Sequence, residues 1–321
     1  MKSNLKFMDF CAGIGGGRTG LTNAGLDCVA FSEIDTNAEE TYRILYGKKE
    51  KNYGDLTKLA IEELPDFDLL IGGFPCQSFS IVGKRKGFED DRGLIIYSLV
   101  EIMKKKNIPF FILENVKGLT NHDKGNTMKT IVKLLEDAGY DLYYKVLNSC
   151  DYGVPQMRER IYFVGIKKGL RKKDFIWPKP QKSKPLNYYL CDDETITLPI
   201  NDKTFVKYLN NKYNKGKFDI NEILSKDYLV LDTRQSDLRL YENKVPTLRT
   251  GRHGILYVKN GELHKLSGYE GLLLQGFSKP LANKTKKANI NSNKLLSQAG
   301  NAMTINVINA ICEELLKCLE D

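Results

Sequence analysis

Apolar runs of strand length alternate with helical patterns along the first 180 residues of the chain. In the helical stretches, apolar residues return at spacings of three and four, which is typical of an amphipathic helix. This alternation predicts βαβ units, and therefore an α/β fold in which helices cover both faces of a mostly parallel sheet. The predicted strands are residues 5–10, 27–33, 68–74, 110–116, 141–149 and 160–166, and the predicted helices are 38–47, 94–107 and 126–140.

The pattern changes at the proline-rich stretch of residues 177–186, after which short strands and polar turns rich in Asn and Lys follow. Helical periodicity returns at the end, where an apolar stripe runs from Ile308 to Leu319. We expect this last helix to pack back on the first domain, which makes the second domain an insertion. The predicted division is a first domain at residues 1–178, a smaller mixed domain at 179–289 and a returning segment at 290–321.

Composition narrows the class of protein. The 321 residues are 41% apolar and 28% charged, and no apolar run approaches the roughly 20 residues that span a bilayer. The N-terminus shows no signal-peptide pattern, so we expect a cytoplasmic protein without a membrane segment. Seven cysteines never form a CxxC pair, and the chain has only three histidines, so we expect neither a disulfide framework nor a metal site.

The net charge of +9 and the pI near 9.0 agree with a polyanionic partner such as nucleic acid. A Lys-rich composition gives the same charge in many proteins without such a partner. The charge therefore supports a nucleic-acid function only in combination with other features.

A glycine-rich turn, "DFCAGIGGGRTG" at residues 9–20, lies between the first predicted strand and a helix. Glu33 ends the second predicted strand, 20 residues after Gly13. This arrangement favours a nucleoside cofactor whose ribose hydroxyls are bound by the acid. The dinucleotide pattern GxGxxG fails at Arg18, and a plain tight turn or a site for a carboxylate at the helix N-terminus stays open.

Two further strand ends carry chemically capable side chains. "GGFPCQSFS" at residues 72–80 presents Cys76 after a buried strand, although a packing role for a free cysteine stays open. Glu114 ends the strand "FFILENV", and Arg158 and Arg160 enter the last strand on one face, where they suit a carbonyl or a phosphate. Ligands of such folds bind at the carboxyl ends of the strands.

These motifs occur in a specific order: "DFCAGIGG", "SEID", "GDL", "GFPCQSFS", "RGLIIYS", "ENVKG", "VPQMRERIYFVG", "LLLQGF" and "QAGNAMTINV". The set covers nearly the whole chain and resembles the bacterial DNA (cytosine-5)-methyltransferases of restriction-modification type. The chain departs from the family at Cys11, where phenylalanine is usual, and in "SGYEGLL", which lacks the family's usual arginines. The resemblance implies a Rossmann-like methyltransferase domain that uses S-adenosylmethionine, and a target-recognition domain that reads DNA.

The resemblance also implies roles for individual residues. Cys76 would add to C6 of a cytosine flipped out of the duplex, Glu114 would act at N3, and Arg160 would hold O2 with Arg158 nearby. The residues expected to bind the cofactor are Cys11, Gly13, Ile14, Gly15, Gly16, Glu33, Ile34, Asp55, Leu56, Pro75, Ile95, Asn301 and Ala302.

Double-stranded DNA is the expected partner of a monomeric enzyme that associates with the nucleoid. The basic segment at residues 78–93 is expected to close over the DNA, and arginines of the small domain can bind either guanine or phosphate. The residues expected to contact DNA are Gln77, Ser80, Lys84, Arg85, Arg234, Gln235, Arg239, Thr247, Arg249 and Arg252.

Other classes of protein fit the sequence less well. A tRNA cytosine-5 methyltransferase is the main alternative, but the Cys-Phe-Thr tripeptide of that branch is absent. The chain also lacks the Pro-Pro-aromatic motif of amino-methylating enzymes and the P-C-x-x-C of zinc deaminases. Arg18 disfavours an NAD dehydrogenase, and the set Cys76, Glu114 and Arg160 disfavours a non-catalytic DNA-binding relative.

Overall fold

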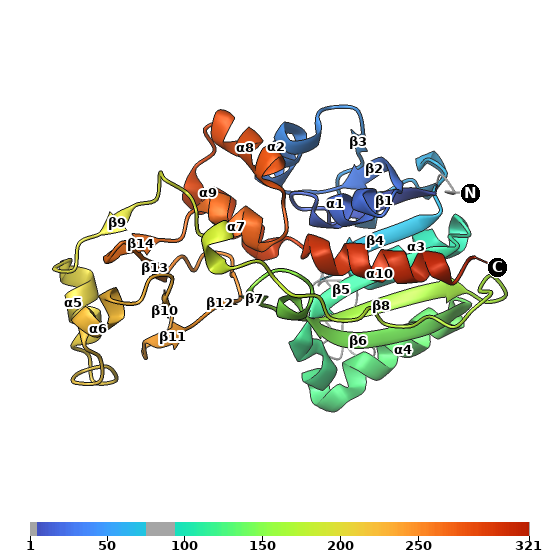
Figure 1. The fold of residues 1–321 in the computed structure, drawn as a ribbon. Coiled ribbons are helices and arrows are strands. Elements are labelled where there is room, and N and C mark those ends of the chain that lie inside the picture. Colours follow the sequence, from blue (N-terminus) through green and yellow to red (C-terminus); the bar gives the residue numbers. More distant parts are fainter. Residues whose placement is uncertain (1–4, 75–93, 321) are drawn as a thin grey trace. The chain divides into compact units, whose positions relative to one another are not determined.

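The computed structural model describes residues 5–74 and 94–320, which form two compact units (Figure 1). Unit 1 comprises residues 1–148, 159–179 and 302–321, and unit 2 comprises residues 149–158 and 180–301. The predicted first boundary at residue 178 lies one residue from the end of the unit 1 segment at 179. The predicted return at residue 290 differs from the observed one at 302, because the helix before it packs against another helix of unit 2.

Unit 1 contains a seven-stranded sheet of order β3-β2-β1-β4-β5-β8-β6, in which β8 is antiparallel to both of its neighbours. The remaining neighbours run parallel, so the predicted α/β fold with a mostly parallel sheet is confirmed. The strands are β1 (Lys6–Phe10), β2 (Asp27–Ser32), β3 (Lys51–Asn52), β4 (Leu69–Gly73), β5 (Phe110–Val116), β6 (Tyr140–Asn148) and β8 (Glu159–Lys167).

Helices cover both faces of this sheet. Successive strand residues point to opposite faces, so Met8 and Phe10 enter the core under α3 and α4, whereas Asp9 lies beside α1. Each fully buried side chain of this size contributes about 1.5–3 kcal/mol to folding. The helices of unit 1 are α1 (Gly16–Asn23), α2 (Thr36–Tyr46), α3 (Leu94–Lys105), α4 (Asn126–Asp137) and α10 (Ile305–Lys317).

The last helix, α10, returns to unit 1 and packs against α1, as the apolar stripe predicts. The two helices approach closely at Gly20, where an added Cβ would lie 2.6 Å from Cβ of Ile308. A side chain larger than hydrogen at residue 20 would therefore force α10 outward.

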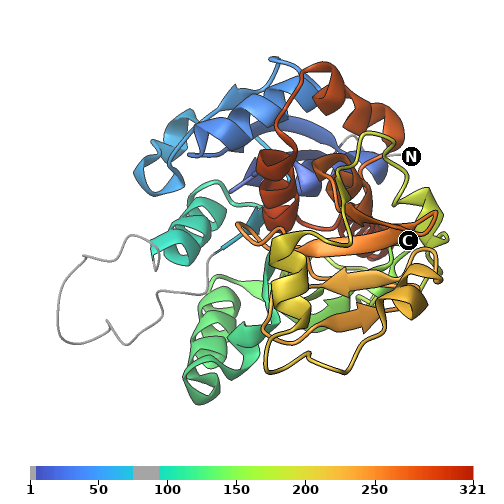
Figure 2. The ribbon, with the colours of Figure 1, turned by 90° about the vertical axis from the view of Figure 1, so that its left-hand side faces the viewer.

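Unit 2 contains a five-stranded sheet of order β11-β10-β13-β14-β9 and a two-stranded sheet of β12 and β7. Figure 2 faces this unit, where Phe205 of α5 and Ile223 of α6 pack with Leu231 and Val258 of the sheet. The strands are β7 (Gln156–Met157), β9 (Thr197–Leu198), β10 (Val230–Asp232), β11 (Arg239–Tyr241), β12 (Val245–Pro246), β13 (Ile255–Lys259) and β14 (Glu262–Lys265). The helices are α5 (Lys203–Leu209), α6 (Ile220–Leu224), α7 (Gly268–Leu274), α8 (Lys279–Lys287) and α9 (Ser292–Asn301).

A buried polar network organises the start of α7, where the expected arginines are missing. Glu270 accepts hydrogen bonds from the Tyr257 hydroxyl (2.8 Å) and from the Ser267 amide (3.0 Å). Burial raises the pKa of Glu270 to about 7. Ser267 donates to Asp192 (2.7 Å), and Lys286 of α8 forms an ion pair with the same Asp192. A lysine from a neighbouring helix thus supplies the cation that the sequence of this segment lacks.

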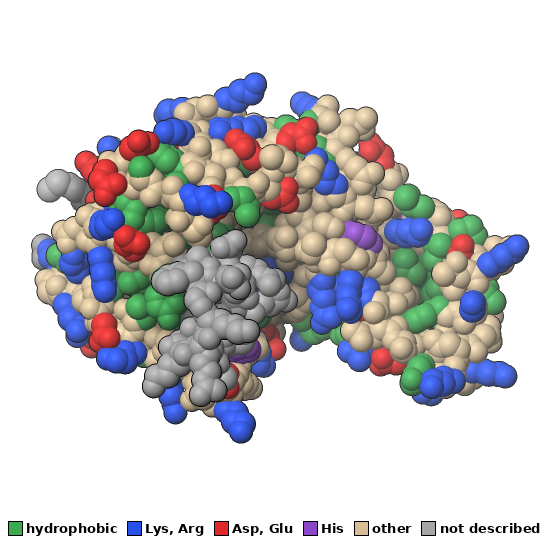
Figure 3. Space-filling view, turned by 180° about the vertical axis from the view of Figure 1, so that it is seen from behind, with side chains coloured by type: hydrophobic (Ala, Val, Ile, Leu, Met, Phe, Trp, Pro, Cys, Tyr) green, Lys and Arg blue, Asp and Glu red, His purple; other side chains and the backbone are tan. Residues whose placement is uncertain are grey.

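Figure 3 shows Lys and Arg side chains interspersed with acidic ones on the face seen from behind, so the positive charge is spread over that face.

None of the helices in residues 5–74 and 94–320 combines the length and the apolar composition that a membrane crossing requires.

Candidate active site

The glycine-rich turn connects β1 to α1 at the carboxyl edge of the unit 1 sheet. Gly13 and Gly15 have φ angles of 54° and 80°, a region that glycine enters at little cost. A Cβ added at Gly13 would meet no atom within 4 Å, so space is open above the turn. The first amides of α1 and this open space suit the polar end of a bound cofactor.

Glu33 follows β2 and holds this turn in place. Its Oε2 accepts a hydrogen bond from the Gly13 amide (2.6 Å), and its Oε1 accepts from the amides of Ile34 (2.9 Å) and Asp35 (2.8 Å). Oε2 keeps one lone pair for a further donor, such as a ribose hydroxyl. The structure therefore brings Glu33 and Gly13 together, as the sequence predicts.

Most of the other residues expected to bind the cofactor lie around this turn in unit 1. Ile34 is 72% exposed, which leaves an apolar side chain for a flat ring to contact, whereas Leu56 is buried. Asp55 accepts hydrogen bonds from the Thr57 hydroxyl and amide, and the hydroxyl contact holds the pKa of Asp55 below its usual range. Asp55 is therefore an ionised acceptor at neutral pH.

Cys11 lies among carboxylates. Burial raises the pKa of its thiol to about 12, and the negative charges of Glu33, Asp9 and Asp55 add to the effect. Cys11 itself adopts a left-handed φ of 51°. The thiol is thus neutral and unreactive, and its place in the turn fits a contact role in the cofactor site.

Asn301 and Ala302 lie on either side of a unit boundary. Asn301 belongs to unit 2, where its Oδ1 accepts a hydrogen bond from the Thr250 hydroxyl. Ala302 is buried in unit 1. The expected contact of Asn301 with the cofactor stays a prediction.

Glu114 and Arg160 form a nearly buried pair of a carboxylate and a guanidinium on neighbouring strands. Glu114 follows Leu113 in β5 and stands in register with Gly73, the last residue of β4. Its Oε1 lies 3.4 Å from Nε of Arg160 on the neighbouring strand β8, and the two side chains are 10% and 14% exposed. This distance is an ion-pair contact without hydrogen-bond geometry, so both groups keep capacity for a ligand.

Asn115 anchors the backbone that leads from β4 toward Cys76. It is buried, and its Nδ2 donates to the carbonyl of Phe74 (2.8 Å) while its Oδ1 accepts from the amide of Val116 (2.7 Å). Asn115 is not among the residues that the motifs predict for the site. A polar residue at the end of an otherwise apolar strand was the signal that could have identified it.

Residues 75–93 lie outside the described part of the chain. The predictions that fall there concern the nucleophile, a cofactor contact and four DNA contacts. They are Cys76, Pro75, Gln77, Ser80, Lys84 and Arg85.

Arg158 differs from its predicted position. The structure assigns it to unit 2, outside β8, whereas Arg160 belongs to unit 1, so the two do not share one strand face. Arg158 is 2% exposed, and its Nη1 donates to the carbonyl of Gly300 (3.0 Å) and lies 3.5 Å from that of Leu248. The guanidinium finds backbone carbonyls of its own unit, so a substrate contact for Arg158 has no support in this arrangement.

Three of the predicted DNA contacts are engaged within unit 2. Arg234 is buried in a bidentate ion pair with Asp232, with both N···O distances 2.7 Å, and it donates to the carbonyl of Thr247 (2.8 Å). The hydroxyl of Thr247 in turn donates to the carbonyl of Met157. The third, Arg239, is half exposed in an ion pair with Asp237. The ion pair with Asp232 neutralises Arg234 in this structure, and the expected contact of Arg234 with DNA stays a prediction.

Arg249 and Arg252 remain the best placed base-reading candidates, because both are exposed on the turn after β12. Two side chains of unit 2 hold the backbone of that turn: Gln156 accepts a hydrogen bond from the Leu248 amide (3.1 Å), and the Gly251 amide donates to Ser297 (3.3 Å). Gln235 is partly buried, and its carbonyl accepts from Tyr208.

Replacement of Arg249 and of Arg234 by Ala is expected to separate recognition from stability. Arg249→Ala should relax the choice of one base pair by about 1–3 kcal/mol if the contact is bidentate to guanine. Arg234→Ala should destabilise unit 2 by about 3–5 kcal/mol, because Asp232 loses its buried partner. Thermal unfolding and binding to duplexes with single base-pair changes measure both effects. An equal loss of affinity for all duplexes in Arg249→Ala would assign that residue to phosphate instead.

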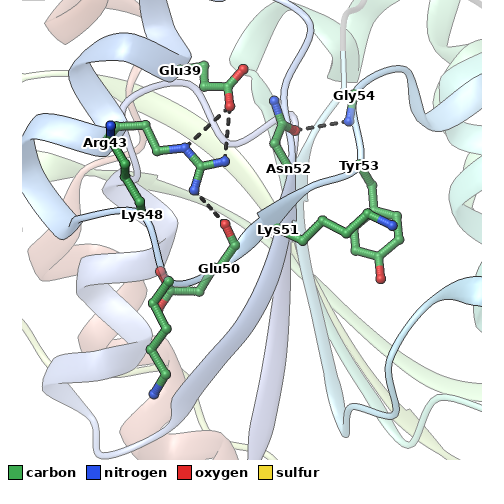
Figure 4. A pocket seen from close by; sticks show the side chains of 9 residues that line it. Glu39, Arg43, Lys48, Glu50, Lys51, Asn52, Tyr53 and Gly54 are labelled. Atoms are coloured by element: carbon green, nitrogen blue, oxygen red, sulfur yellow. Dashed lines mark hydrogen bonds and ion pairs between the residues drawn. The ribbon is translucent and has the colours of Figure 1, made fainter.

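Two of the hollows in the described surface differ from the predicted cofactor site. One, of about 570 Å³, lies beside β3 and is lined by Glu39, Arg43, Lys51 and Asn52 among others (Figure 4). The other, of about 700 Å³, lies in unit 2 next to Phe205 and His253. Neither contains a predicted cofactor residue.

The described residues contain no group of three or more His, Cys, Asp or Glu side chains placed to hold a metal ion.

Comparison with known proteins gives a consistent result. Residues 5–317 match the family described as C-5 cytosine-specific DNA methylase. The chain is 37% identical over 318 residues to the type II methyltransferase M.HaeII of Haemophilus aegyptius, a match that covers 98% of this chain and 93% of that one. It is 33% identical over 320 residues to M.HhaI of Haemophilus parahaemolyticus, covering 96% and 93%. Among solved structures, the Dnmt2 methyltransferase of S. pombe has a TM-score of 0.72 at 20% identity and is covered completely by 99% of this chain, which shows a shared fold.

Proposed function

The chain belongs to the family of C-5 cytosine-specific DNA methylases and is a DNA (cytosine-5)-methyltransferase, and we propose that Cys76, Glu114 and Arg160 carry its reaction. The observation that supports this assignment most directly is the pair of Glu114 and Arg160 at the carboxyl edge of the sheet. Glu114 stands in register with Gly73, three residues before Cys76. One carboxyl group and one guanidinium at this edge suit N3 and O2 of a cytosine.

The chemistry explains why these residue types are needed. Cytosine C5 is too weak a nucleophile to be methylated unaided, so a group must first add at C6. The Cys76 thiolate forms that bond while protonated Glu114 donates to N3, which makes the ring an enamine that is nucleophilic at C5. Arg160 donates to O2 and orients the ring. After methylation, a base takes the C5 proton, the C5–C6 double bond re-forms as Cys76 departs as thiolate, and N3 returns its proton to Glu114.

The residues around the glycine turn fit S-adenosylmethionine. The open space over Gly13, the free lone pair of Glu33 and the exposed Ile34 offer contacts for the amino-acid part, the ribose and the adenine. When bound, S-adenosylmethionine supplies an electrophilic methyl group. The residues of this chain bind and orient it: Glu33 accepts from the ribose, and Asp55 accepts from the adenine amine.

The substrate is a short specific sequence in double-stranded DNA. M.HaeII and M.HhaI are type II methyltransferases, and these relatives support the DNA substrate over the tRNA alternative. A base inside a duplex is out of reach, so the target cytosine is extruded at a cost of a few kcal/mol. We propose that the enzyme acts as a monomer on DNA in the cytoplasm, with unit 2 reading the sequence through Arg249 and Arg252.

Bisulfite sequencing of DNA from a host that expresses the protein tests this function. We expect protected cytosines at one position of one short sequence, and none in DNA from a host that expresses the Cys76→Ser variant. If bisulfite converts every cytosine in DNA from a host that contains the folded wild-type protein, the assignment is refuted. Sequencing of tRNA from the same cells tests the alternative substrate.

A further inference from the structure

We propose that Asn52 is a positioning residue of the cofactor site, which fixes the ends of β2 and β3 so that Glu33 and Asp55 can bind one S-adenosylmethionine molecule. Asn52 is the second residue of the two-residue strand β3 and lies outside the set implied by the sequence motifs. The inference rests on the proposed cofactor site. It adds a residue that acts through the backbone rather than through contact with the cofactor.

The side-chain amide of Asn52 makes three hydrogen bonds to backbone groups. Its Oδ1 accepts from the amides of Glu33 (3.0 Å) and Gly54 (2.9 Å), and its Nδ2 donates to the carbonyl of Glu33 (2.9 Å). Figure 4 shows the contact with Gly54. One carboxamide thus binds both the donor and the acceptor of Glu33, as a neighbouring strand would do.

The Asn52 side chain takes the place of backbone groups here because β3 is only two residues long. Its ladder with β2 ends at the pairing of Asn52 with Phe31, two residues before Glu33. Beyond that point, the Asn52 side chain supplies the hydrogen bonds that a longer β3 would supply. The Ser32 hydroxyl adds one more link, because it donates to the carbonyl of Gly54 (2.6 Å).

Both carboxylates of the proposed site depend on these contacts. The Glu33 backbone is held by Asn52, and the Glu33 carboxylate holds the Gly13 amide (2.6 Å). On the other side, Asn52 fixes Gly54, whose φ of 67° turns the chain directly before Asp55. Loss of Asn52 therefore frees both acids at once, and through Glu33 it frees the glycine turn.

The neighbouring Lys51 provides a matched control. It lies on the same short strand and lines the same hollow, but its Nζ lies over the Tyr53 ring, 4.3 Å from the centroid. Lys51→Ala removes a contact of comparable size on this strand without touching Glu33 or Gly54. An effect that is specific to Asn52 separates positioning of the two acids from general damage to β3.

The experiment measures S-adenosylmethionine binding by calorimetry and steady-state methylation of a duplex for wild type, Asn52→Ala, Asn52→Asp and Lys51→Ala. For Asn52→Ala we expect the Kd and KM for S-adenosylmethionine to rise about 10- to 100-fold, since each lost hydrogen bond weakens the site by several-fold. The kcat at saturating cofactor and the KM for DNA should stay within about twofold. Asn52→Asp keeps the acceptor and loses the donor, so its Kd should lie between those of wild type and Asn52→Ala.

A double-mutant cycle decides whether Asn52 acts through Glu33. In a Glu33→Ala background, Asn52→Ala should raise the Kd by clearly less than it does alone, because the carboxylate that it positions is gone. Equal effects in both backgrounds would overturn the proposal, as would an unchanged Kd in folded Asn52→Ala with only a lower Tm. If Asn52→Ala does not fold, the Kd of Asn52→Asp decides in the same way. Failure of the wild type to bind S-adenosylmethionine would instead contradict the proposed function.

Discussion

Duplex DNA that carries 5-fluorocytosine at the target position is expected to become covalently attached to Cys76 in the presence of S-adenosylmethionine. Addition of the thiolate at C6 and methylation at C5 both proceed, but the release of Cys76 requires removal of a C5 proton that fluorine has replaced. The adduct should survive denaturing electrophoresis as a shifted band. Cys76→Ser should lose the band and roughly 1,000-fold or more of the methylation rate.

The other cysteines serve as internal controls for this experiment. Burial raises the pKa of the thiols of Cys11, Cys28 and Cys312 to about 12, and that of Cys150 to about 11. These thiols are neutral near pH 7 and are poor nucleophiles. Their replacement by Ser should leave the band unchanged, and a band that persists in Cys76→Ser would show that a different group attacks the ring.

Glu114→Gln is expected to lower kcat by about 100- to 10,000-fold, because a carboxamide cannot transfer a proton to N3 of cytosine. The change keeps the size of a side chain that is 10% exposed and lies 3.4 Å from Arg160, so the site should stay assembled. Binding of S-adenosylmethionine should change little, because Glu33 and the glycine turn are untouched. Single-turnover methylation of a short duplex measures the rate without product release.

Glu159 offers a matched control for that variant. It precedes Arg160 on the same strand, and its carboxylate forms an exposed ion pair with Lys117 at 2.9 Å. Exposed pairs contribute about 0–1 kcal/mol, so Glu159→Gln should keep both stability and rate. If the two variants lose activity equally, the role of Glu114 in proton transfer cannot be maintained.

The sequence predicted six of the seven strands of the unit 1 sheet and the elements that carry the candidate site, because buried strands leave long apolar runs. It did not predict that β8 runs antiparallel between β5 and β6. The signal was available: only 10 residues, 150 to 159, separate the two predicted strands, too few for a helix to cross back in parallel. The two-residue strand β3 left no periodic pattern, and so the role of Asn52 was invisible.

For the site, motifs predicted residue types better than their partners. Glu114 and Arg160 lie together because β5 and β8 are neighbours and the end of β5 lies beside the start of β8. Arg158 shares a motif with Arg160, and Arg234 lies in the same predicted DNA-reading stretch as Arg249. Yet Arg158 and Arg234 are both buried and bound to groups of unit 2. A single sequence does not state which arginine meets an internal acid or carbonyl, except where a partner is local, as Asp232 is for Arg234.

The path of the chain between the units limits how recognition can be exchanged between related enzymes. Unit 2 consists of two separate segments, residues 149–158 and 180–301. Along the chain, the first segment connects β6 to β8 of the unit 1 sheet. Gln156 and Arg158 of that short segment hold the backbone of Leu248, next to Arg249. In a chimaera that receives residues 180–301 alone, the turn that carries Arg249 would come from one enzyme and the residues that bind its backbone, 156 and 158, from the other. A transplant that carries both segments would keep turn and support together.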